Sequence, residues 1–477
     1  MNTFKQKALF SALAGAGALA MAGAANAVYV NPDGLGQALV YPYYTVRAGN
    51  VTLLSVVNTT DQAKAVKVRF LEGKNSQEVL DFNLFLSAKD VWVGAIAPTS
   101  DGAAIATSDR SCTNPKIPAS GQPFRNYLFA NDAAALQTLD RTREGYVEII
   151  EMATIPNATA LGKDVTHNNG VPACKLTSDA SFLAATGLLD PSGGIFGNGT
   201  IMNPLGGMST GYDAVAVDGL GLVLATSRTS SGDTLPNLSS GTSKVSVVTN
   251  AGSLYVTQWG SAIDAVSATM MHNQVFGEYA YTGDGIIGTD WVITMPTKNQ
   301  YVNASSVRRP FQRVWNTKTG VSCDDVSLTS TDREEYVGTT SDDFSPRPPD
   351  APGNALCWEA NVISFGGVTS AGASFTLGST NAVGITPVQN QGAAVATAGK
   401  EGGWLTLQFT NPLANMVGLG TVTSVSGSTA STGATAAQTY FGLPVVGFVM
   451  SAASYKTGNP QQNYSNSYSL KYSRSIR

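Results

Sequence analysis

The chain contains two histidines, His167 and His272, so any site that needs an imidazole must use one of them. A Ser-His-Asp hydrolase needs histidine as its base, and a multi-histidine metal centre needs it as a ligand. His167 lies in the turn-like sequence Thr-His-Asn-Asn-Gly, and His272 follows Met271 in a predicted helix. We therefore expect an exposed His167 and a packed or surface His272, with neither in a catalytic site.

Residues 207–211, Gly-Met-Ser-Thr-Gly, match the G-x-S-x-G pattern of a hydrolase nucleophile elbow. That elbow holds its serine between a strand and a following helix. Here Pro204 and two glycines precede Ser209, and a strand-like run at 212–217 follows it. This context does not suit a nucleophile, and we predict that the protein is not an enzyme.

The segment between Cys323 and Cys357 carries eight carboxylates and two arginines. Ca²⁺ takes several oxygen ligands from flexible acidic loops, although the spacing here matches no EF-hand. A solvated acidic loop is the simpler interpretation, so we predict no cofactor, with calcium as the alternative. Glycoside hydrolysis would need two of these carboxylates fixed across a cleft. The candidate calcium ligands are Asp324, Asp325, Asp332, Glu334, Glu335, Asp342 and Asp343.

The four cysteines are an even number, which in an exported protein indicates disulfides. Three pairings are open, and we favour Cys112 with Cys174 and Cys323 with Cys357 because each pair falls inside one predicted domain. A metal site is less expected, because no C-x-x-C spacing occurs and no histidine lies close in sequence to a cysteine.

Aromatic side chains could bind sugars or partner proteins, but packing in a β core is the default role of such rings. The tryptophans concerned are Trp259, Trp291, Trp315, Trp358 and Trp404. Tyrosines of the C-terminal tail could add a strand to a neighbouring subunit. Closing a sheet of their own domain is the more economical expectation.

Residues 50–97 contain four short runs with apolar side chains at every second position: 51–57, 65–71, 79–86 and 91–96. In the second run Lys67 and Arg69 share the face opposite Val66, Val68 and Phe70. A period of two predicts half-buried strands, and turn residues separate the runs. We predict that the four strands form one antiparallel layer of an immunoglobulin-like sandwich.

Other elements follow from local signals along the chain. Pro42 suits an edge strand, because proline cannot donate to a β ladder. Residues 145–152 predict a further strand of the first sandwich. Ser261 and Asp264 predict the start of a helix that continues to about Gly277. Residues 290–296, 403–409 and 442–448 predict strands, and the Ser/Thr/Ala/Gly tract at 421–439 predicts an exposed loop.

The N-terminus has Lys5 and Lys7, an apolar run at 8–22, and a small-residue site ending at Ala27. This is the pattern of a secretory signal peptide cleaved after residue 27. Cleavage would remove two positive charges and take the net charge from −4 to −6. Such a charge-poor, acidic chain is a weak candidate for nucleic-acid binding, and we expect no transmembrane segment after cleavage.

Several phrases of the sequence resemble exported cell-surface-type β-rich proteins of Gram-negative bacteria that carry no assigned activity. The resemblance implies a secreted, extracellular or cell-surface location and adds no catalytic residue. The phrases lie at 41–45, 55–59, 68–73, 90–92, 144–151, 290–298, 332–335 and 442–448.

We therefore predict a mainly β protein: a signal peptide at 1–27, an immunoglobulin-like β-sandwich at 28–179, a Gly-rich β region with one short helix at 180–300, and a β-rich region with the acidic disulfide loop at 301–477. The expected function is a non-catalytic structural or adhesive role at the cell surface. The alternative is a secreted carbohydrate-binding or carbohydrate-active protein. Protein or surface-polysaccharide partners and a homo-oligomer are compatible with both.

Overall fold

The computed structural model describes residues 27–282, 285–333, 335, 337–339, 354–365, 373–385, 400–409, 411–426, 429–454 and 463–477. In these ranges the protein is mainly β, and its few helices are short. The mainly β expectation is thus confirmed. The predicted signal peptide lies outside the described residues apart from Ala27.

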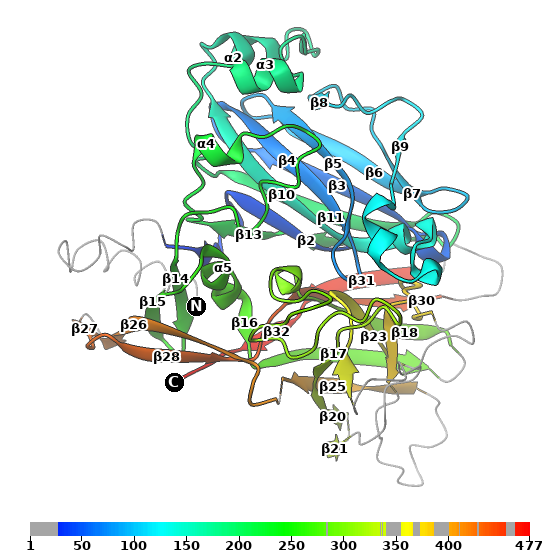
Figure 1. Cartoon of the computed structure of the whole chain (residues 1–477). Coiled ribbons are helices and arrows are strands. Elements are labelled where there is room, and N and C mark those ends of the chain that lie inside the picture. Colours follow the sequence, from blue (N-terminus) through cyan, green and yellow to red (C-terminus); the bar gives the residue numbers. More distant parts are fainter. Residues whose placement is uncertain are drawn as a thin grey trace.

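The N-terminal half is a sandwich of two antiparallel sheets (Figure 1). Phe70 and Phe82 of one sheet and Trp92 of the other share a core in which all three are buried. The first sheet has the order β1 (Tyr29–Val30), β13 (Val215–Asp218), β2 (Ala38–Thr45), β10 (Glu144–Ile155), β4 (Ala63–Glu72), β5 (Glu78–Leu86) and β8 (Cys112–Asn114). The second has the order β12 (Met208–Asp213), β11 (Ile195–Asn203), β3 (Val51–Asn58), β6 (Val91–Pro98), β7 (Ala103–Ala106) and β9 (Gln122–Pro123).

The four strands predicted at 50–97 all exist, but they do not form one layer. β3 pairs with β6 in one sheet, whereas β4 pairs with β5 in the other. The prediction of a single layer is wrong because alternation fixes which side chains face the core and does not fix the partner strand. The topology shows a β-sandwich and does not by itself establish an immunoglobulin-like strand arrangement.

β10 and the glycine-rich segment that follows the predicted first domain both belong to this sandwich. β10 is a central strand between β2 and β4, as expected for residues 145–152. Strands β11, β12 and β13 complete the two sheets, so the boundary predicted at residue 180 falls inside the sandwich.

Pro42 lies in an interior strand, so the predicted edge position is wrong. β13 pairs with β2 only as far as Val40, and the register of β10 against β2 shifts between Gly145 and Val147. Proline is tolerated because the ladder is already interrupted there.

Three larger sheets follow in the C-terminal half (Figure 1). One has the order β14 (Val245–Asn250), β15 (Ser253–Gln258), β26 (Asn415–Ser426), β28 (Ala436–Phe441) and β33 (Ser475–Ile476), with β27 (Thr429–Thr432) on β26. The next has β21 (Val337–Thr339), β20 (Ser327–Asp332), β25 (Lys400–Gln408), β17 (Gln274–Thr282) and β32 (Lys471–Ser473). The last has β24 (Ala382–Ile385), β23 (Ala360–Phe365), β18 (Ile287–Thr294), β30 (Val446–Ala453) and β31 (Tyr464–Ser469). Two short pairs join β16 (Met271–His272) to β29 (Leu443–Pro444) and β19 (Asp324–Asp325) to β22 (Ala355–Leu356).

The C-terminal tail closes one edge of each of these three sheets. β31 is the last strand beside β30, β32 lies beside β17, and β33 lies beside β28. The tail strands therefore complete sheets of their own chain, which is the arrangement that the sequence favoured.

The short helices are α2 (Ala160–Val165), α3 (Asp179–Ala184), α4 (Leu224–Ser227) and α5 (Ala262–Met270), with 3₁₀ turns at Arg47–Gly49, Tyr127–Asn131, Ala134–Leu136, Leu139–Arg143 and Lys298–Gln300. Ser261 caps α5 as predicted, because its hydroxyl accepts a hydrogen bond from the Asp264 amide. The predicted extension to Gly277 is wrong, since β17 begins at Gln274. The predicted loop at 421–439 is also wrong: parts of β26, β27 and β28 occupy it, because backbone pairing needs no apolar period.

Candidate functional site

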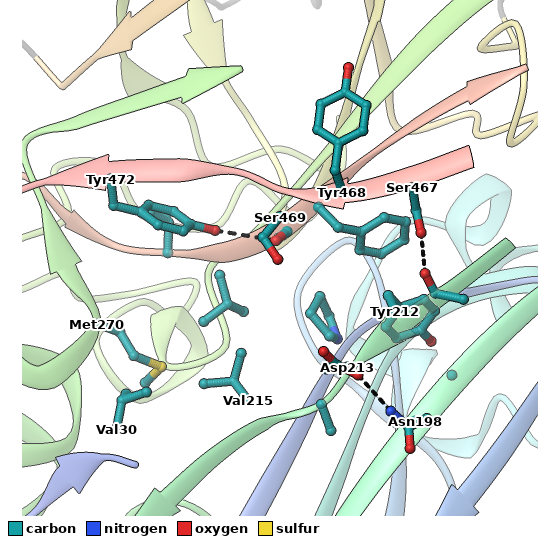
Figure 2. Close-up of a pocket in the computed structure, with 18 of the residues that line it drawn as sticks. Val30, Asn198, Tyr212, Asp213, Val215, Met270, Ser467, Tyr468, Ser469 and Tyr472 are labelled. Carbon is teal, nitrogen blue, oxygen red and sulfur yellow. Dashed lines mark hydrogen bonds between the residues drawn. The ribbon is translucent and has the colours of Figure 1, made fainter. Parts of the chain in front are cut away.

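A cavity of about 520 Å³ lies where the N-terminal sandwich meets the C-terminal sheets (Figure 2). Strands β11, β12 and β13 supply one wall, and β30, β31 and β32 supply the other. The end of α5 and His272 of β16 also line it. Its volume is that of a small-molecule site.

The walls of the cavity are aromatic and aliphatic. Tyr212 stacks on Phe448 across the two halves, with ring centroids 4.5 Å apart and planes 7° from parallel. Tyr472 donates a hydrogen bond to the Gly447 carbonyl (3.3 Å), and its ring stacks on His272 at 4.3 Å. Val30, Val215 and Met270 add aliphatic surface (Figure 2).

Arg474 brings a positive charge to this cavity and caps the end of α5. Its guanidinium donates to the carbonyl oxygens of Met271 (2.7 Å), Ala268 (3.2 Å) and Thr269. The last carbonyls of a helix have no intrahelical partner, so a cation there satisfies them. Burial lowers the pKa of Arg474 to about 10, which leaves the side chain charged at neutral pH.

His272 faces the same space in its neutral form. Burial, and then the positive charge of Arg474, lower its pKa well below 6.5. Within the described ranges the buried Nδ1 atom of His272 has no hydrogen-bond partner. A neutral imidazole has one donor and one acceptor nitrogen, so one hydrogen-bonding position of this ring is unused.

Polar side chains of β11, β12 and β31 form the rim. Asn198 donates to the carboxylate of the exposed Asp213 (2.6 Å), as Figure 2 shows. Ser465 donates to the Ser209 carbonyl (2.9 Å), and Ser467 donates to the Gly211 carbonyl. These hydroxyls satisfy carbonyls of the edge strand β12 and hold the tail against the sandwich.

The ionisable side chains that line the cavity are suited to binding a ligand. Asp213 is engaged at the rim, Arg474 is hydrogen-bonded to backbone carbonyls, and His272 is neutral. Ser209, the serine of the G-x-S-x-G match, lies inside strand β12 and on no strand-to-helix turn, which a nucleophile elbow requires.

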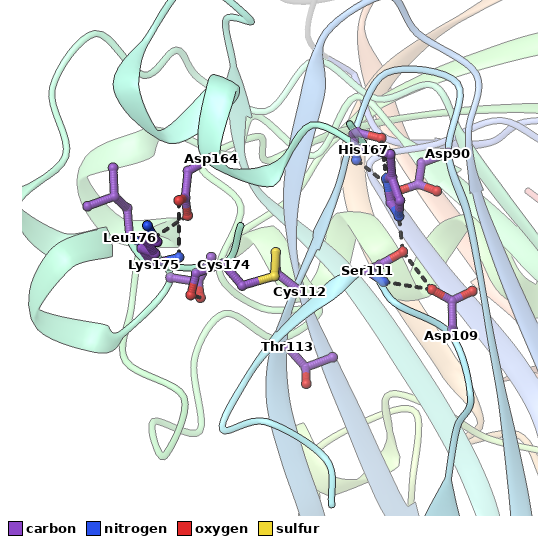
Figure 3. Close-up of a disulfide and its surroundings, with 12 residues drawn as sticks. Asp90, Asp109, Ser111, Cys112, Thr113, Asp164, His167, Cys174, Lys175 and Leu176 are labelled. Carbon is purple, nitrogen blue, oxygen red and sulfur yellow. Dashed lines mark hydrogen bonds and ion pairs between the residues drawn. A yellow bond between two sulfur atoms is a disulfide. The ribbon is translucent and has the colours of Figure 1, made fainter. Parts of the chain in front are cut away.

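His167 meets a serine and an aspartate, but not as a catalytic triad. Ser87 Oγ lies 3.1 Å and Asp90 Oδ2 lies 3.6 Å from the same ring atom, Nδ1. Figure 3 shows Asp90 beside His167. In a triad the serine and the carboxylate contact different nitrogens of the imidazole. Ser111 beside them donates to Asp109 (2.7 Å), which is a local turn contact.

The disulfides join Cys112 to Cys174 and Cys323 to Cys357, the sequential pairing. The first ties the segment after α2 to strand β8, where Asp164 accepts hydrogen bonds from two backbone amides (Figure 3). Two disulfides fit an exported protein, because such bonds persist in oxidising compartments. Among the described residues no helix combines the length and the apolar character needed to cross a membrane.

The acidic residues predicted to bind calcium are not brought together in the described part of the chain. Asp324 is buried against Lys298 (2.7 Å), and Asp325 pairs with Arg313 (3.1 Å). Asp332 ends β20, and Glu335 lies beyond it. The described residues contain no group of three or more potential ligands that could hold a metal ion. Glu334, Asp342 and Asp343 lie outside the described residues, so the calcium site stays a prediction.

Four of the five tryptophans named as surface candidates are buried, as expected of core rings: Trp259, Trp291, Trp315 and Trp358. Trp404 is the exception and is 45% exposed. Among these five tryptophans, only Trp404 is exposed enough to stack on a sugar.

The outward side of the second N-terminal sheet, here called the outer face, is apolar and nearly uncharged. Leu53, Val91 and Val93 are 37%, 47% and 47% exposed. β3 and β6 are paired, so these side chains lie on adjacent strands. Leu53 and Val93 also line a hollow of about 420 Å³. The outer face consists of Val51, Leu53, Ser55, Val57, Val91, Val93, Ala95, Ala97, Ala104, Ala106, Phe196, Asn198, Thr200, Met202, Ser209, Gly211 and Asp213.

Sequence reasoning missed both the cavity and the outer face. The outer face has a detectable signal, because Val51, Leu53 and Val57 are apolar on the side of β3 that alternation would assign to solvent. The cavity has none, since Arg474 and Val215 are far apart in sequence and meet only in the folded chain.

No model of a known protein family matches the chain, and comparison with curated proteins and with solved structures gives no significant similarity.

Proposed function

We propose that this chain is an exported, non-catalytic protein with a structural or adhesive role at the cell surface or outside the cell, and that its outer face is the contact surface. The observation that carries this proposal is the composition of that face, on which Asp213 is the one charged side chain. The disulfides and the resemblance to Gram-negative surface proteins support the location.

The solvated face of an antiparallel sheet is normally polar, and a large exposed apolar patch marks a contact site. We assign a second copy of the chain as the occupant. A sheet face with one charged side chain and a largely aliphatic centre can pack on its own copy at about 10 Å, which is the mode by which sheets form sandwiches. Such pairing would give the structural role, and the N-terminal sandwich would act as an immunoglobulin-like presenting module.

The test compares Val93→Glu with Val171→Glu, because both valines are 47% exposed and only Val93 belongs to the outer face. A buried carboxylate in each copy opposes association, so Val93→Glu should weaken self-association at least about tenfold. Sedimentation velocity over a concentration series measures this. A wild-type chain that stays monomeric, or a control that weakens equally, would refute the assignment.

The carbohydrate-binding alternative has one supporting observation. The hollow of the outer face presents hydroxyl and amide groups from Ser55, Thr107, Asn198 and Thr200. Glycan binding that is lost in Asn198→Leu, with self-association unchanged, would favour this alternative.

A further inference from the structure

Arg474 differs from the buried cations of the N-terminal sandwich in what neutralises it. Three of those cations form ion pairs with buried carboxylates. Lys64 lies 2.7 Å from Glu151, Arg69 lies 2.6 Å from Glu148, and Arg141 lies 2.7 Å from Glu72. Within the described ranges no carboxylate ion-pairs with Arg474, whose hydrogen bonds go to backbone carbonyls.

The end of a helix neutralises this guanidinium only in part. A helix C-terminus carries about half of a negative elementary charge. The remaining positive charge acts in a cavity with apolar walls, where a charge without a counter-ion is costly. The cavity therefore has a charged end that favours an anion.

Open space adjoins Arg474 in two places. The residue lines the large cavity and also a neighbouring hollow of about 100 Å³, and the two hollows share Val30, Thr269 and Arg474. His272 lines the same cavity with its imidazole ring, although its unpartnered Nδ1 atom is itself buried. His272 and Arg474 are close enough for the charge of one to act on the other.

We infer that the cavity binds an apolar monocarboxylate, with its carboxylate at Arg474 and its hydrocarbon body between Tyr212, Phe448 and Tyr472. A single carboxylate matches the single cation, and the stacked rings suit an aromatic or aliphatic body. The imidazole ring of His272, which lines the cavity, would lie near the bound acid group. The cavity shares Asn198, Thr200, Gly211 and Asp213 with the outer face, but its charged end is Arg474 of the C-terminal tail, which is not part of that face. Acid binding therefore does not require self-association.

Calorimetric titration of the purified chain tests the inference with two acids and their neutral counterparts: benzoate with benzyl alcohol, and octanoate with 1-octanol. A charge-assisted contact should make at least one acid bind about tenfold more tightly than its alcohol. Benzoate binding indicates an aromatic ligand class, and octanoate binding indicates an aliphatic one. Failure of both acids to bind, or alcohols that bind as well as the acids, overturns the inference.

The two histidines give an independent NMR readout on the unmodified protein. A carboxylate at Arg474 should shift the imidazole signals of His272 and raise its pKa, while His167, which lies beside Ser87 and Asp90, should not respond. Equal shifts at both histidines, or none at His272, would count against the site.

Two variants complete the test. Val215→Phe fills the cavity without removing Arg474 and should abolish acid binding, whereas Val171→Phe, at an exposed position, should leave it unchanged. Arg474→Lys keeps the charge but loses the planar fork, so it should bind acids more weakly and still prefer them to alcohols. Undiminished binding in a folded Val215→Phe protein would overturn the location.

Discussion

Buried lysines and arginines of the N-terminal sandwich are satisfied inside the fold. Lys67 donates to Asp81 (3.0 Å) and to the Ser230 carbonyl (2.5 Å), and Arg69 contacts both Glu78 and Glu148 at 2.6 Å. Removing one partner of a buried pair leaves an uncompensated charge, which costs about 3–5 kcal/mol. These pairs therefore fix how the sheets and covering segments fit together.

Asp81 provides a pH test of this arrangement. Burial is the main cause that raises the pKa of Asp81 from 3.8 to about 6. Between these values the unfolded chain ionises while the folded one keeps the proton, so stability is lost as pH rises from about 4 to 6. The loss should be about 2 kcal/mol, given about 1.4 kcal/mol per pKa unit. Urea unfolding at pH 4, 5 and 6 measures it.

Asp81→Asn should flatten this pH dependence, because the amide does not titrate. Asp61→Asn is the matched control, since Asp61 is 87% exposed, and it should leave the slope unchanged. If stability still falls with pH in the Asp81→Asn protein, other carboxylates cause the pH dependence.

The sequence placed Lys67 and Arg69 correctly opposite the apolar side chains, but it could not show that this second face is covered. Ser230 and Thr229, far along the chain, contact Lys67 and Asn83 through their carbonyls. Alternating charge predicts solvent exposure unless a distant segment lies over the strand. The cysteine pairing that the sequence favoured, one pair inside each predicted domain, is the one observed, whereas burial of these charges could not be predicted.

At the scale of elements, the C-terminal tail covers an edge of three different sheets. An uncovered edge presents unpaired N–H and C=O groups that can template aggregation. A chain that ends at residue 462 would expose the outer edges of β30, β17 and β28 together. We expect this truncation to give aggregated protein, measured as the soluble fraction after expression and by light scattering.

A shorter truncation is the control. Ending the chain at Arg474 removes only β33, so β30 and β17 keep their partners and the chain should stay largely soluble. Equal aggregation of both truncated chains would show that β33 alone protects the protein. If the chain that ends at residue 462 stays fully soluble, the tail strands are not needed to protect the three sheet edges.

Element positions were largely predictable, and their partners were not. Runs at 65–71 and 79–86 correspond to the paired strands β4 and β5, because a short turn joins them. The run at 51–57 pairs instead with 91–96 and with residues 195–202, beyond the range of any local signal. The cavity depends on these long-range partners, which explains why the sequence did not reveal it.

At the scale of the whole molecule, the two halves share their cores. Val292, Phe448 and Met450 of the C-terminal half pack in the core of the N-terminal sandwich, and Leu71 and Tyr146 of the sandwich pack with the C-terminal core. Polar contacts add to this junction: Trp315 donates to Asp132 (2.7 Å), and Thr294 donates to the Pro42 carbonyl (2.6 Å). Neither half can unfold without exposing apolar surface of the other.

We therefore expect one cooperative thermal transition, with equal calorimetric and van't Hoff enthalpies. Tyr212→Ala should lower the free energy of unfolding by about 3 kcal/mol, because it removes a buried ring that stacks on Phe448. If the halves are coupled, the whole transition should move to lower temperature as one peak. A conservative Tyr212→Phe change keeps the stack and should cost less. Two separate peaks in the wild-type protein, or a shift confined to part of the heat absorption in Tyr212→Ala, would show that the halves fold independently and that the cavity lies at a mobile junction.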